Sequence, residues 1–266
     1  MRVLALDTTT RAGSVALVDD TLIVEERPGD PSRTHAERLP AELLAVSEAH
    51  GVALSSIDIF AVAAGPGSFT GLRIGLATVQ GLAFVTGRQI VGISALEALA
   101  QVASRAVAAG TIVAAWMDAQ RREVFSALYR VTSAELFDPG RLVELKPAGV
   151  GDPESTLARW RDHLDPSTRL GAGPSTSLGA GEAVVFVGDG AVLYADLVRG
   201  RGEAAWRVMA PPLLAGALGR MAVARARRGE AVDPAGVRPV YVRRPDAEIA
   251  RDTKNAPPRR TQGSQR

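Results

Sequence analysis

The sequence predicts an α/β protein with two lobes, because a block of short strands followed by helices occurs twice along the chain. Short apolar runs bounded by turn-forming residues mark the strands, and apolar residues at helical spacing behind Ser or Thr caps mark the helices. The second block begins near residue 111, where a strand, a turn and a strand start again. A hydrophobic content of 46% over 266 residues is enough for a large buried core.

The first block opens with three short strands. Apolar runs at 3–6, 15–18 and 22–24 are separated by polar residues, and Asp19 with Asp20 fits the tight turn between the last two. These runs predict a small antiparallel unit at the start of the chain.

Two helices and a strand complete the first block. Thr34 and Glu37, three positions apart, form a capping-box pattern that predicts a helix over 34–50. The apolar run at 57–64 predicts a buried strand, and the apolar segment at 70–85 predicts a second helix behind a glycine-rich turn.

The capping-box pattern recurs before the second block. Ser94 and Glu97 predict the start of an Ala-rich helix that stops at Gly110. Apolar runs at 112–117 and 123–131 then predict two strands.

A charged turn joins these two strands. It contains Arg121 and Arg122, which we expect to be exposed and to have no catalytic part. Further along, 184–187 predicts a short strand that runs into a glycine turn, and 213–228 predicts a last amphipathic helix.

The expected organisation is a first lobe at 1–105, a second lobe at 106–208, and a segment at 209–230 whose helix packs back on the first lobe. Residues 165–181 are rich in Pro, Ser, Thr, Gly and Ala, which is typical of a flexible insertion. The segment 250–266 is expected to be a disordered basic tail.

Charge is unevenly distributed along the chain. Residues 238–266 contain eight Arg/Lys and three Asp/Glu, a formal charge of +5, whereas residues 1–237 carry −3. A basic tail attracts nucleic-acid phosphates, although a solvated disordered end is the simpler interpretation.

Composition also limits the function classes. The chain has no cysteine, which excludes disulfides and thiolate metal sites and favours the cytoplasm. The apolar stretch before Asp7 is too short for a secretory signal. The longest charge-free apolar stretch, between Arg73 and Arg88, is shorter than the roughly 20 residues that span a bilayer, so no membrane segment is expected.

The strongest local motif is the glycine-rich segment 65–75, which leads from a strand into a helix. Such a turn presents backbone N–H groups where phosphates bind. The spacing fits neither the dinucleotide fingerprint nor the Walker pattern, so a purely structural tight turn stays an equal alternative.

Small residues recur at helical spacing in the helix that follows. Gly71 and Gly75 are four apart, as are Ala77 and Gly81, and each helical glycine costs about 1 kcal/mol relative to alanine. Close approach of another helix, from the same chain or from a partner, would compensate this cost. With the helix at 34–50, this helix is expected to form a partner interface. The expected interface residues are Leu39, Leu43, Gly71, Leu72, Gly75, Leu76 and Val79.

Two further segments resemble degraded phosphate loops. Asp7 stands at a strand end, as in the actin, sugar-kinase and chaperone-ATPase architecture, but Thr8 and its neighbours replace the usual loop glycine. Asp189 intrudes into a second glycine turn, and an Asp that caps a turn is the simpler interpretation of either carboxylate. The residues expected to form these vestigial loops are Asp7, Thr8, Gly65, Gly67, Gly188 and Gly190.

Metal and nucleophilic catalysis lack candidate residues. The three histidines, His35, His50 and His163, are far apart and form no i, i+4 ligand pair. No Gly-x-Ser-x-Gly motif occurs. The sequence therefore predicts no catalytic residue, no metal and no resident cofactor.

The assembled motifs are similar to those of the TsaB family, also called YeaZ, the bacterial dimerisation subunit needed to make threonylcarbamoyladenosine in tRNA. The resemblance runs from end to end of the chain. Its residues are Leu4-Ala5-Leu6-Asp7-Thr8, the segment 65–75, Asp118-Ala119, Glu123-Val124-Phe125, Gly188-Asp189-Gly190-Ala191 and Tyr241-Val242-Arg243.

The segment 65–75 also resembles the catalytic threonylcarbamoyl-transferring paralogue, which carries two metal-binding histidines on the helix that follows. Ala95 and Leu99 stand at those positions here, and neither side chain binds a metal. The resemblance therefore implies a non-catalytic relative.

The resemblance implies a two-lobed actin-like ATPase fold with a degenerate nucleotide site. It further implies a cytoplasmic scaffold that forms a heterodimer with the catalytic paralogue while threonylcarbamoyl is transferred from its adenylate to adenosine 37 of tRNA. An ATPase subunit is a further expected partner, and tRNA would be met mostly through the partner. Homodimerisation and residual nucleotide binding at the partner interface are left open.

The alternative from another class is an active kinase or ATPase of the same fold. Asp7 and the glycine turns favour it, and the missing loop glycine opposes it.

Overall fold

The computed structural model describes residues 1–164, 184–201 and 206–243, and groups their strands into two five-stranded sheets. The expected insertion at 165–181 and the tail at 250–266 lie outside the described residues. In both sheets an antiparallel three-strand unit is followed by two parallel strands, so the order β3-β2-β1-β4-β5 is repeated as β8-β7-β6-β9-β10. The architecture is therefore duplicated, with a two-lobed α/β layout.

The first sheet contains the predicted N-terminal strands. Asp20 has a positive φ of 51° at the tight turn, as a hairpin turn requires. The strands of the first sheet are β1 (Arg2–Asp7), β2 (Ser14–Asp19), β3 (Leu22–Pro28), β4 (Ile59–Gly65) and β5 (Gln89–Ser94).

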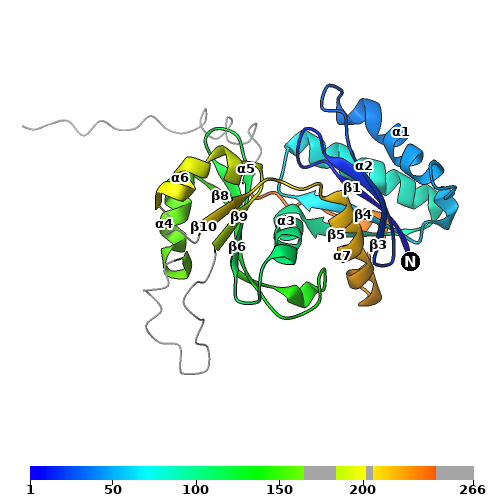
Figure 1. Cartoon of the computed structure of the whole chain (residues 1–266). Helices are drawn as coiled ribbons and strands as arrows, with labels where there is room; N and C mark the ends of the chain where they lie inside the picture. The colour runs from blue at the N-terminus through cyan, green and yellow to red at the C-terminus, as the bar shows by residue number, and fades with distance from the viewer. Residues whose placement is uncertain (165–183, 202–205, 244–266) are drawn as a thin grey trace, which may run out of the picture.

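Helices α1 (His35–Glu48) and α2 (Phe69–Thr86) cover the outer face of this sheet (Figure 1). The predicted capping box is present at the start of α1, where the Glu37 carboxylate accepts from the Thr34 amide at 2.8 Å. Helix α2 ends at Gly87, which adopts the left-handed conformation that C-terminal glycines permit.

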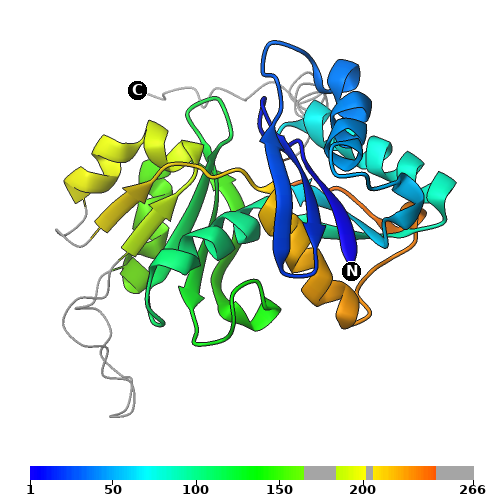
Figure 2. The same ribbon diagram turned by 45° about the vertical axis from the view of Figure 1, so that its right-hand side comes forward.

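The second sheet carries its helices on the opposite side of the molecule (Figure 2). Trp116, Trp160 and Phe186 pack between this sheet and α4 in one apolar cluster. The strands are β6 (Ile112–Asp118), β7 (Val124–Val131), β8 (Leu142–Gly151), β9 (Val184–Val187) and β10 (Trp206–Met209). The helices are α4 (Pro153–Leu164), α5 (Asp189–Leu193) and α6 (Ala195–Arg201).

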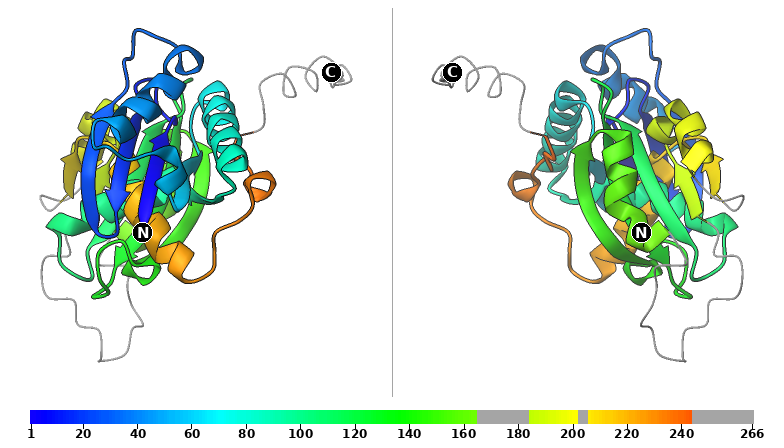
Figure 3. Two further views of the ribbon diagram at one scale, coloured as in Figure 1. Left: turned by 90° about the vertical axis from the view of Figure 1, so that its right-hand side faces the viewer. Right: turned by 90° about the vertical axis from the view of Figure 1, so that its left-hand side faces the viewer.

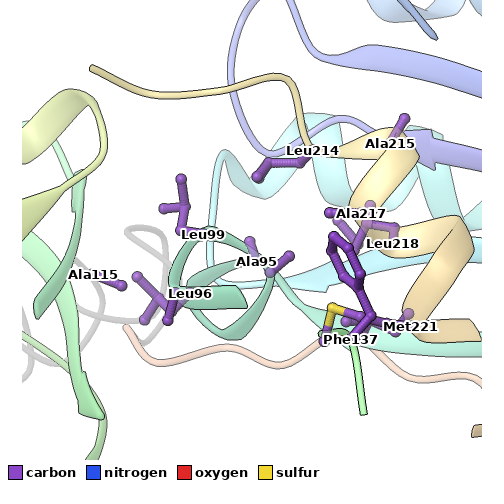
Figure 4. Close-up of a cluster of buried hydrophobic side chains, with 14 of the residues drawn as sticks. Ala95, Leu96, Leu99, Ala115, Phe137, Leu214, Ala215, Ala217, Leu218 and Met221 are labelled. Atoms are coloured by element: carbon purple, nitrogen blue, oxygen red, sulfur yellow. The ribbon is translucent and has the colours of Figure 1, made fainter. Parts of the chain in front are cut away.

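Helices α3 (Ala95–Ala103) and α7 (Ala215–Arg227) lie between the two sheets (Figure 1). Helix α3 packs on β6 and β7, and α7 packs on β1, β2 and β4, so each helix leaves one sheet and covers the other. Leu96, Leu99, Leu214, Leu218 and Met221 interdigitate here (Figure 4). One apolar cluster therefore joins both lobes, and the lobe boundaries at 105 and 208 stay a prediction.

Helix α3 is shorter than predicted. It ends at Ala103 and passes through a 3-10 turn at Ser104–Ala106, whereas the sequence indicated a helix up to Gly110. The guanidinium of Arg141 donates to the Ser104 carbonyl at 2.9 Å. A side chain remote in sequence therefore supplies a hydrogen-bond donor for a carbonyl at the end of the helix.

The last described segment leaves α7 and runs back beside α2, as the two side views show (Figure 3). We call residues 232–243 the C-terminal strap. Val232 pairs with Ile90 at the edge of β5, and the Val240 amide donates to the Ala64 carbonyl at 2.7 Å. Arg243 then donates to the Ala119 carbonyl in the second lobe at 2.6 Å. The strap therefore connects the end of β4 with the turn between β6 and β7.

Candidate functional site

The carboxylate of Asp7 lies at the end of β1 and is occupied by its own turn. It accepts from the Thr9 amide at 2.9 Å and from the Thr9 hydroxyl at 2.7 Å. Asp7 is buried, and this burial raises its pKa above the usual range, against the two hydrogen bonds that lower it. The side chain therefore acts as an Asx-type turn cap in this structure.

The second glycine turn is filled in the same way. Asp189 accepts from the Asp118 amide at 3.0 Å and from the Gly190 amide at 2.9 Å, and burial raises its pKa. Its negative charge also contributes to the raised pKa of Asp7. Gly188, at a φ of 122°, packs directly on the Trp116 carbonyl, where no side chain fits.

The glycine turn before α2 is covered by other parts of the chain. A Cβ on Gly65 would lie 2.6 Å from the Val240 carbonyl oxygen, and one on Gly67 would lie 2.6 Å from the Thr9 Cβ. Ser68 caps α2 by accepting from the Gly71 amide at 3.3 Å. Strap, loop and cap residues therefore occupy the surroundings of this turn, where a phosphate loop would hold its ligand.

The first small-residue notch of α2 is internal. Gly71 packs on the carbonyl of Thr8, and Gly75 packs on the Thr8 hydroxyl, both more closely than any Cβ permits. The compensating neighbour is thus the end of β1 and not another helix. The Thr8 hydroxyl is fully buried beneath the helix and has no hydrogen-bond partner among the residues that the structure describes.

The aliphatic residues expected at a partner surface are also internal. Their exposed fractions do not exceed 4%, because these side chains attach α1 and α2 to the sheet. These buried residues are Leu39, Leu43, Leu72, Leu76 and Val79. Any surface that the two helices offer to a partner must therefore be built from other residues.

The opposite face of α2 carries an exposed apolar stripe. Phe84 and Val85 are 79% and 84% exposed, and a Cβ on Gly81 would meet nothing within 4 Å. Ala77 is exposed on the same face, and Leu44 of α1 is partly exposed at 38%. The second small-residue notch of the sequence, and not the first, is therefore open.

Helix α2 is long and apolar enough to cross a membrane by length and composition, and one third of its 18-residue window is buried. One such helix is weak evidence, because core helices of soluble proteins have the same composition. Its apolar character is accounted for by a buried face on β4 and by the exposed stripe.

A pair formed by the buried Arg38 and the partly buried His35 holds the loop after β1, which the sequence did not indicate. Arg38 is only 2% exposed and donates to the carbonyls of Arg11 and Ala12. His35 places Nε2 3.1 Å from the Thr10 carbonyl oxygen and Nδ1 2.9 Å from Arg38, so the neutral Nε2–H tautomer fits both contacts. Burial lowers the pKa of His35, and the Arg38 charge lowers it further.

Metal ligands do not come together in the part of the chain that the structure describes. No group of three His, Asp or Glu side chains there is placed to hold an ion. Ala95 and Leu99, at the positions where the catalytic paralogue would carry histidines, are buried in the apolar cluster between the lobes.

Comparisons with known proteins agree with this geometry. The family model described as "TsaD: tRNA N6-adenosine threonylcarbamoyltransferase" matches residues 27–251. The tRNA threonylcarbamoyladenosine biosynthesis protein TsaB of Escherichia coli (strain K12) is 39% identical over 130 residues, which is 49% of this chain and 55% of that protein. The TsaB of Haemophilus influenzae is 40% identical over 128 residues, 47% of this chain and 52% of that protein. The alignment thus spans about half the length of these curated relatives.

A solved structure extends the likeness to nearly the whole chain. YeaZ from Pseudomonas aeruginosa is 31% identical with a TM-score of 0.67, covering 90% of this chain and 99% of that one. A second Pseudomonas aeruginosa structure, titled as similar to peptidase YEAZ, is 32% identical with a TM-score of 0.69, covering 91% and 99%. The resemblance found in the sequence motifs and the two-lobed actin-like ATPase fold are both confirmed, and the chain belongs to the TsaB (YeaZ) family.

Proposed function

We propose that this chain is a non-catalytic subunit in the synthesis of tRNA N6-threonylcarbamoyladenosine. Its role would be to bind and support the catalytic threonylcarbamoyltransferase paralogue in the cytoplasm. The observation that carries the proposal is the state of the vestigial site. Atoms of the chain itself pack against the glycines of both turns, and groups of the chain itself donate hydrogen bonds to the carboxylates of Asp7 and Asp189.

The site supports a binding role because it lacks what phosphoryl or carbamoyl transfer needs. Asp7 is buried, Asp189 is partly buried, and both have raised pKa values, a state opposite to that of an exposed, ionised carboxylate that organises a hydrated metal ion. Ala95 and Leu99 provide no ligand at the positions of the paralogue's histidines. The chemistry would therefore belong to the partner.

The exposed stripe of α2 supports a docking role. Phe84 and Val85 present apolar side chains beside the open backbone at Gly81, which lets a helix approach closely. We propose that this stripe, with Leu44 of α1, is where the paralogue or a second copy of the chain binds. The partner surface proposed from the sequence thus stays on α1 and α2 but moves to their outward faces.

Reconstitution tests the proposal. The purified chain should neither hydrolyse ATP nor modify tRNA alone, and it should raise t6A formation when added to the catalytic paralogue with the pathway's ATPase subunit. Isothermal titration with ATP and Mg²⁺ provides the contrast. Metal-dependent turnover by the chain alone that Asp7→Ala abolishes would establish the kinase alternative and sink the scaffold proposal.

A further inference from the structure

The turn between β6 and β7 has a backbone that its residues do not favour. Gln120, Arg121 and Arg122 are consecutive non-glycine residues with φ values of 58°, 56° and 63°. The left-handed region is disfavoured for residues with a Cβ, and glycine or asparagine usually occupies it. Placing two arginines there is a cost that the turn alone does not explain, and such strain is typical of segments that carry function.

Contacts within the turn fix this conformation. The Asp118 carboxylate accepts from the Gln120 amide at 2.8 Å and from the Gln120 side chain at 2.6 Å. The Ala119 amide donates to the Glu123 carbonyl at 3.0 Å, and the Glu123 amide donates to the Gln120 carbonyl at 3.0 Å. These hydrogen bonds stabilise the turn in this conformation.

The C-terminal strap holds the turn from outside. Arg243 donates to the Ala119 carbonyl at 2.6 Å and pairs with the Glu123 carboxylate. Arg243 is itself mostly covered and lies above the Phe125 ring, with 5.6 Å between guanidinium carbon and centroid. The strap thereby keeps Arg121 and Arg122, both exposed, at the tip of the turn.

The surface beside the turn is cationic and aromatic. On the strap, Tyr241 stacks on Phe69 with ring centroids 5.2 Å apart, and both side chains are partly exposed. The Arg73 guanidinium lies 4.0 Å above the Phe69 ring and donates to the Tyr241 hydroxyl at 3.0 Å. Arg238 of the strap is exposed as well. Neither Arg73, Arg122 nor Arg238 forms an ion pair with a carboxylate of the described residues.

The chain that continues beyond the strap has the same sign of charge. Residues 244–266 contain six Arg/Lys and three Asp/Glu. The positive charge of the chain is thus concentrated from residue 238 onward, whereas residues 1–237 carry −3.

We propose that the β6–β7 turn with Arg121 and Arg122, together with Arg73 of α2 and Arg238 of the strap, binds the phosphate backbone of RNA. Guanidinium groups match phosphate oxygens in charge and geometry, and exposed aromatic rings beside them suit unstacked bases. The inference rests on the proposed function, which supplies tRNA as the RNA present. The proposal has the chain contact tRNA directly, whereas the family resemblance implied contact with tRNA mostly through the catalytic partner.

Charge-matched variants of the full chain test this surface. Arg121→Gln/Arg122→Gln should weaken binding of fluorescently labelled unmodified tRNA and reduce the slope of log K against log salt by about 2, one for each lost phosphate contact. The control Arg105→Gln/Arg207→Gln removes the same charge at two exposed sites away from the turn and should leave the slope unchanged. Equal binding of wild type and the turn variant would overturn the proposal.

Glycine variants separate binding from folding. Arg121→Gly/Arg122→Gly relieves the left-handed backbone, so its Tm should equal or exceed that of the wild type while RNA binding falls. A purely structural turn predicts unchanged RNA binding instead. Loss of binding to the catalytic paralogue with unchanged RNA affinity would also overturn the proposal, since the turn would then recognise a protein.

Assay of the reconstituted complex keeps the two proposals distinguishable. If the wild-type chain fails to raise t6A formation, the proposed function fails whatever the RNA affinity. If it raises t6A formation and the turn variants bind tRNA like the wild type, only the RNA surface fails.

Discussion

Gly75 of α2 lies directly on the Thr8 hydroxyl at the end of β1, so that any Cβ at this position would overlap the threonine side chain. The helix proposed to dock a partner and the vestigial loop after β1 are therefore in immediate contact. Arg38 and His35 of α1 hold the same loop, and the His35 ring also lies against Gly71 of α2. Both outer helices thus depend on the conformation of one loop.

Substitution of Gly75 should destabilise the fold, whereas substitution of Gly81 should stabilise it. Gly75→Leu overpacks the contact with Thr8, which costs about 1–3 kcal/mol or more, so its Tm should fall clearly. Gly81→Ala meets no neighbour and should raise helix stability by about 0.5–1 kcal/mol. Thermal unfolding of the two variants measures the loss of stability in Gly75→Leu and the gain in Gly81→Ala. An unchanged Tm for Gly75→Leu would contradict the internal packing.

The exposed stripe of α2 should control partner affinity without supporting the fold. Phe84→Ser/Val85→Ser removes apolar surface that is open in the single chain, so Tm should change little while the dissociation constant for the paralogue or the self-dimer rises tenfold or more. Leu193→Ser, exposed by 59% on the second lobe, is the matched control. An equal loss of affinity in both variants would contradict the proposal that the stripe binds the partner.

The buried carboxylate of Asp7 should make stability depend on pH. Because burial raises its pKa above 3.8, the folded state holds the proton more tightly than the unfolded state. Ionised Asp7 therefore destabilises the fold at neutral pH, and this effect disappears as pH falls through the raised pKa toward the unfolded value. Asp7→Asn keeps an oxygen acceptor for Thr9 and should have a higher Tm than the wild type at pH 7, with a smaller difference at pH 4. A larger difference in Tm in favour of the variant at pH 4 than at pH 7 would contradict the predicted direction of the pH dependence.

Titration of His35 should change the stability of the fold with pH in the opposite direction to Asp7, and in a higher pH range. Its pKa is lowered from 6.5 chiefly by burial, so the unfolded state takes up the proton first as pH falls. The stabilisation is complete above pH 6.5 and is lost below it, when the protonated ring can no longer accept from Arg38 through Nδ1. His35→Gln should therefore be less stable than the wild type at pH 7.5 but lose less stability between pH 7.5 and 5.5. Parallel Tm profiles for the two proteins would show that the ring does not titrate in this range.

The sequence alone determined the duplicated α/β fold, the capped starts of α1 and α3 and the glycine turns, because apolar periodicity, caps and turn residues are local signals. It did not indicate β8, α4 or β10. Strand β8 lies at a sheet edge with mixed burial and contains Pro147, so it lacks the alternation of a half-buried strand.

Only the tertiary structure decided what each feature packs against. Two small-residue notches on α2 look alike in sequence, yet Gly75 lies on β1 and Gly81 is open, because helical spacing specifies a face and not its neighbour. In the same way, Arg243 joins the β6–β7 turn across 124 positions of sequence, and no local pattern contains a contact of that range.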